Sequence, residues 1–279
     1  MSDALRSLLT ALGDDELILG HRHSEWTGYA PHMEEDVAFS SIAQDEIGHA
    51  AAYYSIAAAV TGGSPDALAF GRDPGDYRNA ILCERPNGDW AFTLARHWLY
   101  DNADDVRLAV LEESSHADLA ALARKIRREE RYHLIHADAW IQRIVHGPVE
   151  GRTKLVEAVS EAYPEALGLF EPVENEDAAL GEGLLPVPSG ELLQRFVDRT
   201  ASALDELGLP TEARALADET AEFVASSSGD LIAREAGEEP AQAARPAAFG
   251  GRSGRHTDGF KELWDVMTVT YRSHPGASW

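Results

Sequence analysis

Cysteine and long apolar runs are scarce in this chain of 279 residues, and each scarcity excludes a class of protein. Cys83 is the single cysteine, so no disulfide can form within the chain. No stretch approaches the roughly 18 consecutive apolar residues that a membrane-spanning helix needs. Residues 1–20 alternate acidic and apolar side chains and show no signal-peptide pattern. These features together predict a cytoplasmic protein that does not associate with a membrane.

Basic side chains are also few. Lysine and arginine total 24 against 48 aspartates and glutamates, which gives a formal net charge of −24, and only three residues are lysine. A surface this acidic repels nucleic acid and anionic lipids, and no basic stripe compensates for it. The composition therefore predicts that neither nucleic acid nor a membrane is a partner.

Strand signals are nearly absent, and helical spacing of apolar residues dominates the chain. Helices are predicted at about 3–28, 32–61, 89–113, from the turn at 114–118 to about 145, and at about 152–170, 189–207, 211–226 and 257–272, with long loops at 63–88 and 227–256. Long helices joined by short turns form antiparallel neighbours in a bundle. We expect an all-α, ferritin-like four-helix bundle with additional C-terminal helices. It is predicted to be one domain over 1–279, with the core at about 3–147 and accessory helices at about 152–274.

Two Glu-x-x-His pairs interrupt the apolar stripes of the second and fourth long helices. They are Glu46 with His49, and Glu130 with His133. Residues three apart share a helix face, so one helix can offer a carboxylate and an imidazole to one metal ion. A charge placed on a core-facing stripe costs several kcal/mol unless it has a partner or a metal.

Each pair has one lone carboxylate opposite it in the predicted hairpin. Antiparallel helices rise equally from their connecting turn, so residues equally far from the turn lie at the same height. Glu16 and Glu46 are equally far from Pro31, and Asp101 and Glu130 are equally far from the turn at 115–116. We therefore expect Glu16 beside Glu46, and Asp101 beside Glu130.

Four carboxylates and two imidazoles from four helices are the ligand set of di-iron bundle proteins. The predicted metal ligands are Glu16, Glu46, His49, Asp101, Glu130 and His133. Oxygen and imidazole ligands without thiolate favour iron or manganese over structural zinc, and we expect two iron ions and no organic cofactor. No catalytic residue is predicted beyond the metal site. The alternative is that these six residues form buried salt bridges without metal.

Several neighbouring polar residues receive secondary interpretations. Asp45 and Glu129, each directly before a ligand glutamate, are candidates to accept the outer N–H of a ligand histidine; solvated acids are the alternative. Glu25 could replace Glu16 as a ligand, but its nearness to the turn favours a solvated or capping role. His23 is interpreted as a surface or second-layer residue. A third pair, Glu113 with His116, lies at a turn and is attributed to chance.

Four short motifs resemble the phenylacetyl-CoA epoxidase family, and the C subunit of that enzyme most closely. They are Glu25-Trp26-Thr27-Gly28-Tyr29-Ala30-Pro31, Arg85-Pro86-Asn87-Gly88-Asp89, Arg131-Tyr132-His133 and Gly254-Arg255-His256-Thr257. The resemblance implies a ferritin-like fold and a hetero-oligomeric complex. In that complex the related A subunit binds phenylacetyl-CoA, and its di-iron centre uses dioxygen to form the ring 1,2-epoxide. A separate reductase supplies electrons from NADPH.

Within that family, the C subunit is usually a non-catalytic partner whose ligand set is incomplete. This sequence departs from the pattern, because its six predicted ligands match the positions at which the catalytic subunit keeps its own. The resemblance thus leaves three functions open: a di-iron oxygenase component, a structural subunit that docks a catalytic relative, and a ferritin-like protein that handles iron or peroxide. An orphan oxygenase with another substrate is a variant of the first.

Overall fold

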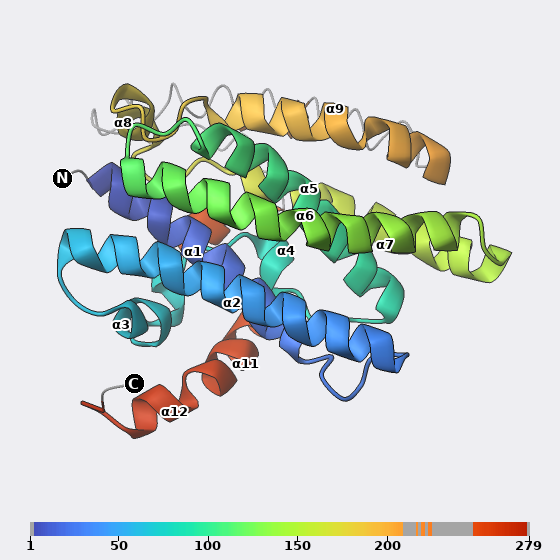
Figure 1. The fold of residues 1–279 in the computed structure, drawn as a ribbon, viewed down its shortest axis with the longest axis horizontal. Coiled ribbons are helices and arrows are strands. Elements are labelled where there is room, and N and C mark those ends of the chain that lie inside the picture. Colours follow the sequence, from blue (N-terminus) through green and yellow to red (C-terminus); the bar gives the residue numbers. More distant parts are fainter. Residues whose placement is uncertain (1–2, 209–215, 217–218, 221–222, 225–247, 278–279) are drawn as a thin grey trace. The chain divides into compact units, whose positions relative to one another are not determined.

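The structure is a computed structural model that describes residues 3–208, 216, 219–220, 223–224 and 248–277. Every regular element among these residues is a helix (Figure 1), and the fold class is all-α and ferritin-like, as predicted. The helix predicted at 211–226 and most of the loop predicted at 227–256 lie outside the described residues.

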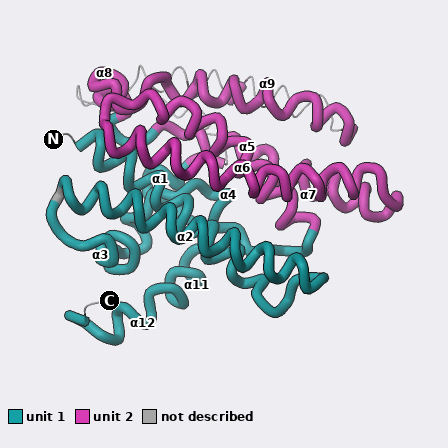
Figure 2. Tube along the Cα trace, viewed as in Figure 1, with its two compact units in different colours: residues 1–90, 173–175, 250–279 teal, residues 91–172, 176–249 magenta. Residues whose placement is uncertain are grey.

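The chain divides into two compact units (Figure 2). Unit 1 comprises residues 1–90, 173–175 and 250–279, and unit 2 comprises residues 91–172 and 176–249. Neither unit is one continuous stretch, because residues 173–175 and 250–279 belong to the same unit as residues 1–90. That the whole chain forms a single domain stays a prediction.

A helical hairpin of α1 (Asp3–Ser24) and α2 (Met33–Thr61) forms the larger part of unit 1. The two helices lie alongside each other over most of their length (Figure 1). A Cβ atom placed on Gly20 would lie 2.8 Å from Cγ1 of Ile47 and 3.2 Å from the carbonyl oxygen of Ala43. Glycine at this position therefore allows the two backbones to approach closely.

Short helices occupy the segment predicted as a long loop at 63–88. They are α3 (Pro65–Phe70), the 3₁₀ helix η1 (Pro74–Asp76) and α4 (Ile81–Glu84). The side chain of Ser64 caps α3 by accepting a hydrogen bond of 3.1 Å from the Ala67 backbone N–H. α3 packs against α2, and α4 packs against α1. The segment is irregular, but it is folded onto the hairpin.

The C-terminal residues of unit 1 return to this hairpin through buried ion pairs. The Arg252 guanidinium donates to both carboxylate oxygens of Asp15, at 2.8 and 2.6 Å. The Glu84 carboxylate accepts from the Thr257 backbone N–H at 2.6 Å and lies 2.7 Å from Nδ1 of His256. Gly254 has φ of +76°, and a Cβ there would lie 2.1 Å from the Gly75 carbonyl oxygen. The C-terminal segment can therefore follow this path only with glycine at position 254.

The last predicted helix, at 257–272, is observed as two shorter ones. The returning segment contains the 3₁₀ helix η3 (Gly251–Ser253), then α11 (Asp258–Met267) and α12 (Val269–Ser273). The Trp264 indole N–H donates to the Arg72 carbonyl oxygen at 3.1 Å. This bond ties α11 to the segment that follows α3.

Unit 2 contains a second antiparallel hairpin, α5 (Trp90–Leu111) and α6 (Ala117–Val145), with α5 starting at the last residue of unit 1. Side chains join the two helices along their length: the Trp98 indole N–H donates to Asp138, and Arg127 donates to Asp105, both at 2.9 Å. The N-cap of α6 is His116, whose Nδ1 accepts from the Leu119 N–H at 3.3 Å. The histidine of the pair attributed to chance thus caps α6.

Further helices complete unit 2. They are α7 (Val149–Ala166), the 3₁₀ helix η2 (Leu167–Phe170), α8 (Glu176–Gly181) and α9 (Ser189–Leu207). α9 has the predicted bounds, whereas α8 was not predicted. The Glu176 carboxylate accepts from the backbone N–H and the hydroxyl of Ser189 at 3.0 and 2.5 Å, which joins α8 to the start of α9.

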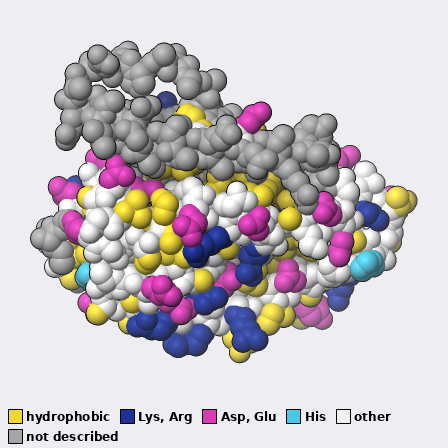
Figure 3. Space-filling view, turned by 90° about the horizontal axis from the view of Figure 1, so that it is seen from above, with side chains coloured by type: hydrophobic (Ala, Val, Ile, Leu, Met, Phe, Trp, Pro, Cys, Tyr) yellow, Lys and Arg dark blue, Asp and Glu magenta, His cyan; other side chains and the backbone are white. Residues whose placement is uncertain are grey.

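The surface carries both signs of charge. Acidic side chains on the face drawn in Figure 3 are separated by basic and apolar ones. The excess of acid therefore does not gather into one patch on that face. Among the described residues, no helix combines the length and the apolar character that crossing a membrane requires.

Candidate metal centre

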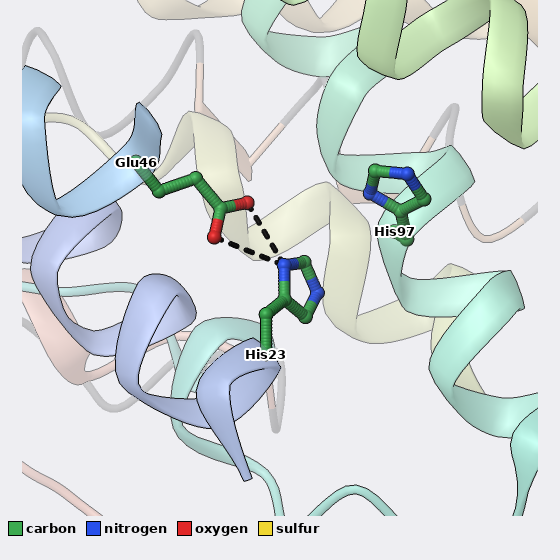
Figure 4. Close-up of side chains that lie close together, drawn as sticks. All are labelled: His23, Glu46 and His97. Carbon is green, nitrogen blue, oxygen red and sulfur yellow. Dashed lines mark hydrogen bonds and ion pairs between the residues drawn. The ribbon is translucent and has the colours of Figure 1, made fainter. Parts of the chain in front are cut away.

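The α1–α2 hairpin of unit 1 holds two buried carboxylate–imidazole pairs. Nδ1 of His49 lies 3.3 Å from Oε2 of Glu16. Nearer the connecting turn, Nδ1 of His23 lies 2.9 Å from the Glu46 carboxylate (Figure 4). All four residues have exposures of 2% or less. Two acids and two imidazoles therefore face each other along one side of this hairpin.

This pairing differs from the alignment of α1 with α2 that the sequence predicted. Glu16 was expected beside Glu46, but its partner is His49, about one helical turn farther along α2. Backbone N–H groups of Glu25, Trp26 and Thr27 bond to carbonyls three residues back, so helical turns continue past the end of α1. The prediction assumed that the connection is symmetric about Pro31. The additional turns after α1 make the connection asymmetric.

The α5–α6 hairpin of unit 2 also holds two pairs. Nδ1 of His97 lies 3.3 Å from Asp101, four residues later on the same helix, and Nδ1 of His133 lies 3.0 Å from Glu130. These four residues have exposures of 3% or less. The rings of His97 and His133 are 6.3 Å apart between centroids.

Hydrogen bonds across the second hairpin bracket the position of Asp101. The bond between Trp98 and Asp138 lies on one side of Asp101, and the bond between Asp105 and Arg127 lies on the other. Asp101 therefore lies opposite the part of α6 between residues 127 and 138, which contains both Glu130 and His133, and its placement directly beside Glu130 stays a prediction.

Burial changes the acidity of Glu130. Removal from water raises the pKa of this carboxyl, and the nearby acids Asp101 and Asp104 raise it further. The His133 ring acts in the opposite direction through charge and a hydrogen bond, but it does not cancel the effect of burial. A cation beside Glu130 would favour the charged carboxylate, so the position suits a positively charged ligand.

The four pairs share a geometry that fits a metal ion. In each pair Nδ1 faces a carboxylate oxygen at 2.9–3.3 Å. Two ligand atoms at right angles, each about 2.1 Å from an ion, lie roughly 3.0 Å apart. A hydrogen bond has the same length, so these distances suit both a metal site and a metal-free ion pair. The donor set contains no thiolate, which favours iron or manganese.

All six residues predicted as ligands are buried. The structure places Glu16, Glu46 and His49 in unit 1 and Asp101, Glu130 and His133 in unit 2. It pairs Glu16 with His49 and Glu130 with His133, whereas the imidazoles opposite Glu46 and Asp101 come from residues outside the predicted set.

Sequence reasoning missed two histidines, His23 and His97. His23 was interpreted as a surface or second-layer residue, yet it is fully buried against Glu46, and His97 is equally buried against Asp101. Helical spacing could have found both. His23 follows Glu16 by seven residues, or two turns, and His97 precedes Asp101 by four, or about one turn. The candidate set is therefore four carboxylates and four imidazoles.

The residues given secondary interpretations lie closer to solvent. Asp45 is exposed, and Glu129 is half-buried and pairs with Lys125 at 3.1 Å. A role for either acid in orienting a ligand histidine stays a prediction. Glu25 is exposed and accepts from the side chains of Arg22 at 2.7 Å and Asn87 at 3.0 Å, which fits the solvated one of the two roles, solvated or capping, that were preferred for it.

Comparison with known proteins identifies the family. The family model described as "Phenylacetic acid catabolic protein" matches residues 1–233. The chain belongs to this family. It is also similar to the C subunit of 1,2-phenylacetyl-CoA epoxidase from Escherichia coli (strain K12), with 36% identity over 178 residues, which are 63% of this chain and 72% of the relative. The family resemblance found in the four short motifs is confirmed.

Two of those motifs have structural roles in this chain. The Asn87 side chain donates to the Arg22 carbonyl oxygen at 2.7 Å and so holds the end of α1. His256 and Thr257 bond to Glu84, as described above. The first of these motifs therefore attaches the segment after α4 to the end of α1, and the second attaches the C-terminal segment to α4. A third motif contains His133, one of the candidate ligands.

Proposed function

We propose that this chain is a component of a multi-subunit phenylacetyl-CoA epoxidase, a monooxygenase of aerobic phenylacetate degradation in the cytoplasm. The family match and the similarity to the C subunit of that epoxidase support this proposal. Its partners would be a homologous catalytic chain and a reductase in a homo- or hetero-oligomer, and the substrate would be an acyl-CoA. The family match supports participation of the chain in an oxygenase. The proposed metal chemistry depends on the buried carboxylates and imidazoles of the two hairpins.

The second part of the proposal is that the two hairpins each supply half of a carboxylate-bridged di-iron site. The observation that supports it is the arrangement of eight buried groups as four pairs, two in each hairpin, with Nδ1 facing a carboxylate in every pair. Four ionisable groups buried in each hairpin cost several kcal/mol unless their charges are balanced. Two divalent ions would balance four carboxylates.

Each residue would have a defined task in this site. His49 and His133 would each bind one iron through the ring nitrogen that faces a carboxylate, Glu46 and Glu130 would bridge or chelate, and Glu16 and Asp101 would complete the ligand set. His23 and His97 are placed to bind as well, or to hold Glu46 and Asp101 in orientation by hydrogen bonds. When bound, the iron pair would supply the activation of dioxygen. The protein's part is to position these ligands and exclude water.

The alternative function is that of a structural subunit which docks and stabilises the catalytic chain without binding metal. The same distances favour it, because a histidine and a carboxylate about 3 Å apart form a stable hydrogen-bonded ion pair by themselves. Four such pairs would neutralise the buried acids with protons in place of iron. The two functions therefore differ in one measurable quantity, the metal content.

Iron quantitation on the purified chain tests the site. About two irons per chain are expected for wild type, with a loss of most of that iron in the Glu46→Ala/His133→Ala double variant. A matched control is Glu113→Ala/His116→Asn, which alters the Glu-x-x-His pair at the α5–α6 turn and keeps a side chain able to cap α6. Metal content that is equal in all three proteins would refute the ligand assignment. Absence of iron from folded wild type would favour the structural role.

Turnover tests the other half of the proposal. With the catalytic chain and reductase supplied, phenylacetyl-CoA should be epoxidised, and omission of this chain should lower the rate. A wild-type chain that contains iron but has no effect on this reaction would point to another substrate or to iron handling.

A further inference from the structure

Unit 1 contains a cavity of about 280 Å³ beside the N-terminal half of α1, which contributes Arg6, Ser7, Thr10 and Ala11 to its lining. Three more arginines line it, namely Arg72, Arg78 and Arg252, in a chain where acids outnumber bases two to one. Leu68 and Val173 add apolar side chains. The volume suits a small ligand, since pockets for drug-sized molecules begin at roughly 300 Å³.

Two of the four arginines are already neutralised by buried acids. Arg72 pairs with Asp14, which is fully buried, and Arg252 forms the two-pronged pair with Asp15. Their role is to build the inner wall and fix its shape. Neither guanidinium is expected to supply much net attraction for a ligand.

Arg78 differs from them in its partners. Its Nη1 donates to the carbonyl oxygens of Gly75 and Tyr77, both at 2.8 Å, and these groups are neutral. Among the described residues no carboxylate pairs with the Arg78 guanidinium, so its charge is uncompensated while its position is fixed. Arg6 pairs with Asp3 at 3.3 Å, but both side chains are more than half exposed, and such pairs are weak.

Acids also line this cavity, but they lie toward solvent. Asp76 and Glu174 are exposed, as is Arg6, whereas Arg78 is half-buried and Arg252 is buried. The interior of the cavity is therefore richer in donors and positive charge than its mouth. A carboxylate or phosphate that entered would meet guanidinium groups and hydroxyls, and no buried acid among the lining residues.

The geometry points to a binding site for the phosphate group of a phosphorylated small molecule, with Arg78 and Arg6 as its charged contacts. Guanidinium presents a planar fork of N–H donors that matches phosphate oxygens, and the Ser7 and Thr10 hydroxyls can donate to the oxygens that remain. The apolar side chains of the lining would contact the organic part. This site lies wholly in unit 1 and does not depend on the proposed oxygenase function.

Calorimetric titration of the full-length chain at constant ionic strength tests the inference. Two probes distinguish the possible sources of the group: inorganic phosphate, and adenosine 3′,5′-bisphosphate as a phosphate ester. We expect saturable binding at one site with at least one probe below about 10 mM. Adenosine, which lacks phosphate, should not bind. Tighter binding of inorganic phosphate would identify a free-anion site and overturn the assignment to a phosphorylated molecule, and tighter binding of the ester would support it.

Variants connect the binding to the arginines. Arg78→Gln should weaken it about tenfold and Arg6→Gln severalfold, because each removes a charged donor. Arg195→Gln makes the same charge change on α9, where Arg195 pairs with Glu191, and should leave the affinity unchanged. Arg6 is exposed, so its variant remains informative if Arg78→Gln fails to fold. No saturable heat with either probe, equal weakening in the Arg195 variant, or equal binding of adenosine would overturn the inference.

Discussion

Replacement of Asp15 by alanine should destabilise the chain strongly, because the variant leaves a buried charge without its partner. The Arg252 guanidinium donates two hydrogen bonds to Asp15, and the exposures of the two side chains are 3% and 0%. Asp15 also accepts from the backbone N–H of Ala80 at 2.8 Å, so a second buried donor would lose its acceptor. Breaking a buried pair by removing one partner costs roughly 3–5 kcal/mol, and an orphaned backbone donor adds about 1 kcal/mol or more.

Equilibrium unfolding in urea, followed by circular dichroism, measures this loss. Asp15→Ala should lower the free energy of unfolding by about 4–6 kcal/mol, which corresponds to a fall in Tm of roughly 8–24 °C for a protein of this size. Asp3→Ala is the matched control. It removes an acid from the exposed pair with Arg6 and should cost under about 1 kcal/mol. Equal effects of the two variants would refute the claim that the Arg252–Asp15 pair is buried and stabilising.

Two further predictions concern packing and pH. Gly20→Ala should destabilise by about 1–3 kcal/mol, because its Cβ would lie 2.8 Å from Ile47; Gly48→Ala on α2, with nothing within 4 Å, should stabilise by up to about 1 kcal/mol. Thermal melts of the two variants that shift in the same direction would contradict this. Because burial raises the pKa of Glu130 above its ordinary value of 4.5, the folded metal-free chain binds this proton more tightly than the unfolded chain does. Its free energy of unfolding should therefore decrease as pH rises from that value through the raised pKa, and Glu130→Gln should remove that decrease. Urea unfolding of both proteins at about pH 4.5 and about pH 7.5 checks the sign, and an unchanged pH dependence in the variant would disprove it.

The sequence predicted the helices well because helical periodicity is a local signal. The bounds of α9 and the end of α6 match, and the apolar stripes that contain Glu46 and Glu130 are buried as expected. The short helix α8 was missed, since six residues carry too little periodicity to be recognised.

The candidate site was predicted in its residue types but not in its pairing. The residue of α2 that lies beside Glu16 depends on how many helical turns follow α1. Hydrogen bonds in the connection form those turns, and the spacing of apolar residues does not reveal them. His23 lies two helical turns from Glu16, a spacing that the Glu-x-x-His pattern does not include. The arginine-lined cavity could not be predicted, because Arg6, Arg78 and Arg252 come from distant parts of the sequence.

The contacts that the C-terminal segment makes with Asp15 and Glu84 can form only late in synthesis. Asp15 and Arg252 are separated by 237 positions, and Glu84 and His256 are separated by 172. A ribosome that adds about 5–20 residues per second exposes both acids for many seconds before their partners emerge. The first hairpin must therefore tolerate unpaired acids while the chain grows. A nascent chain that stalls before position 250 would lack both contacts and become a preferred target for chaperones and proteases.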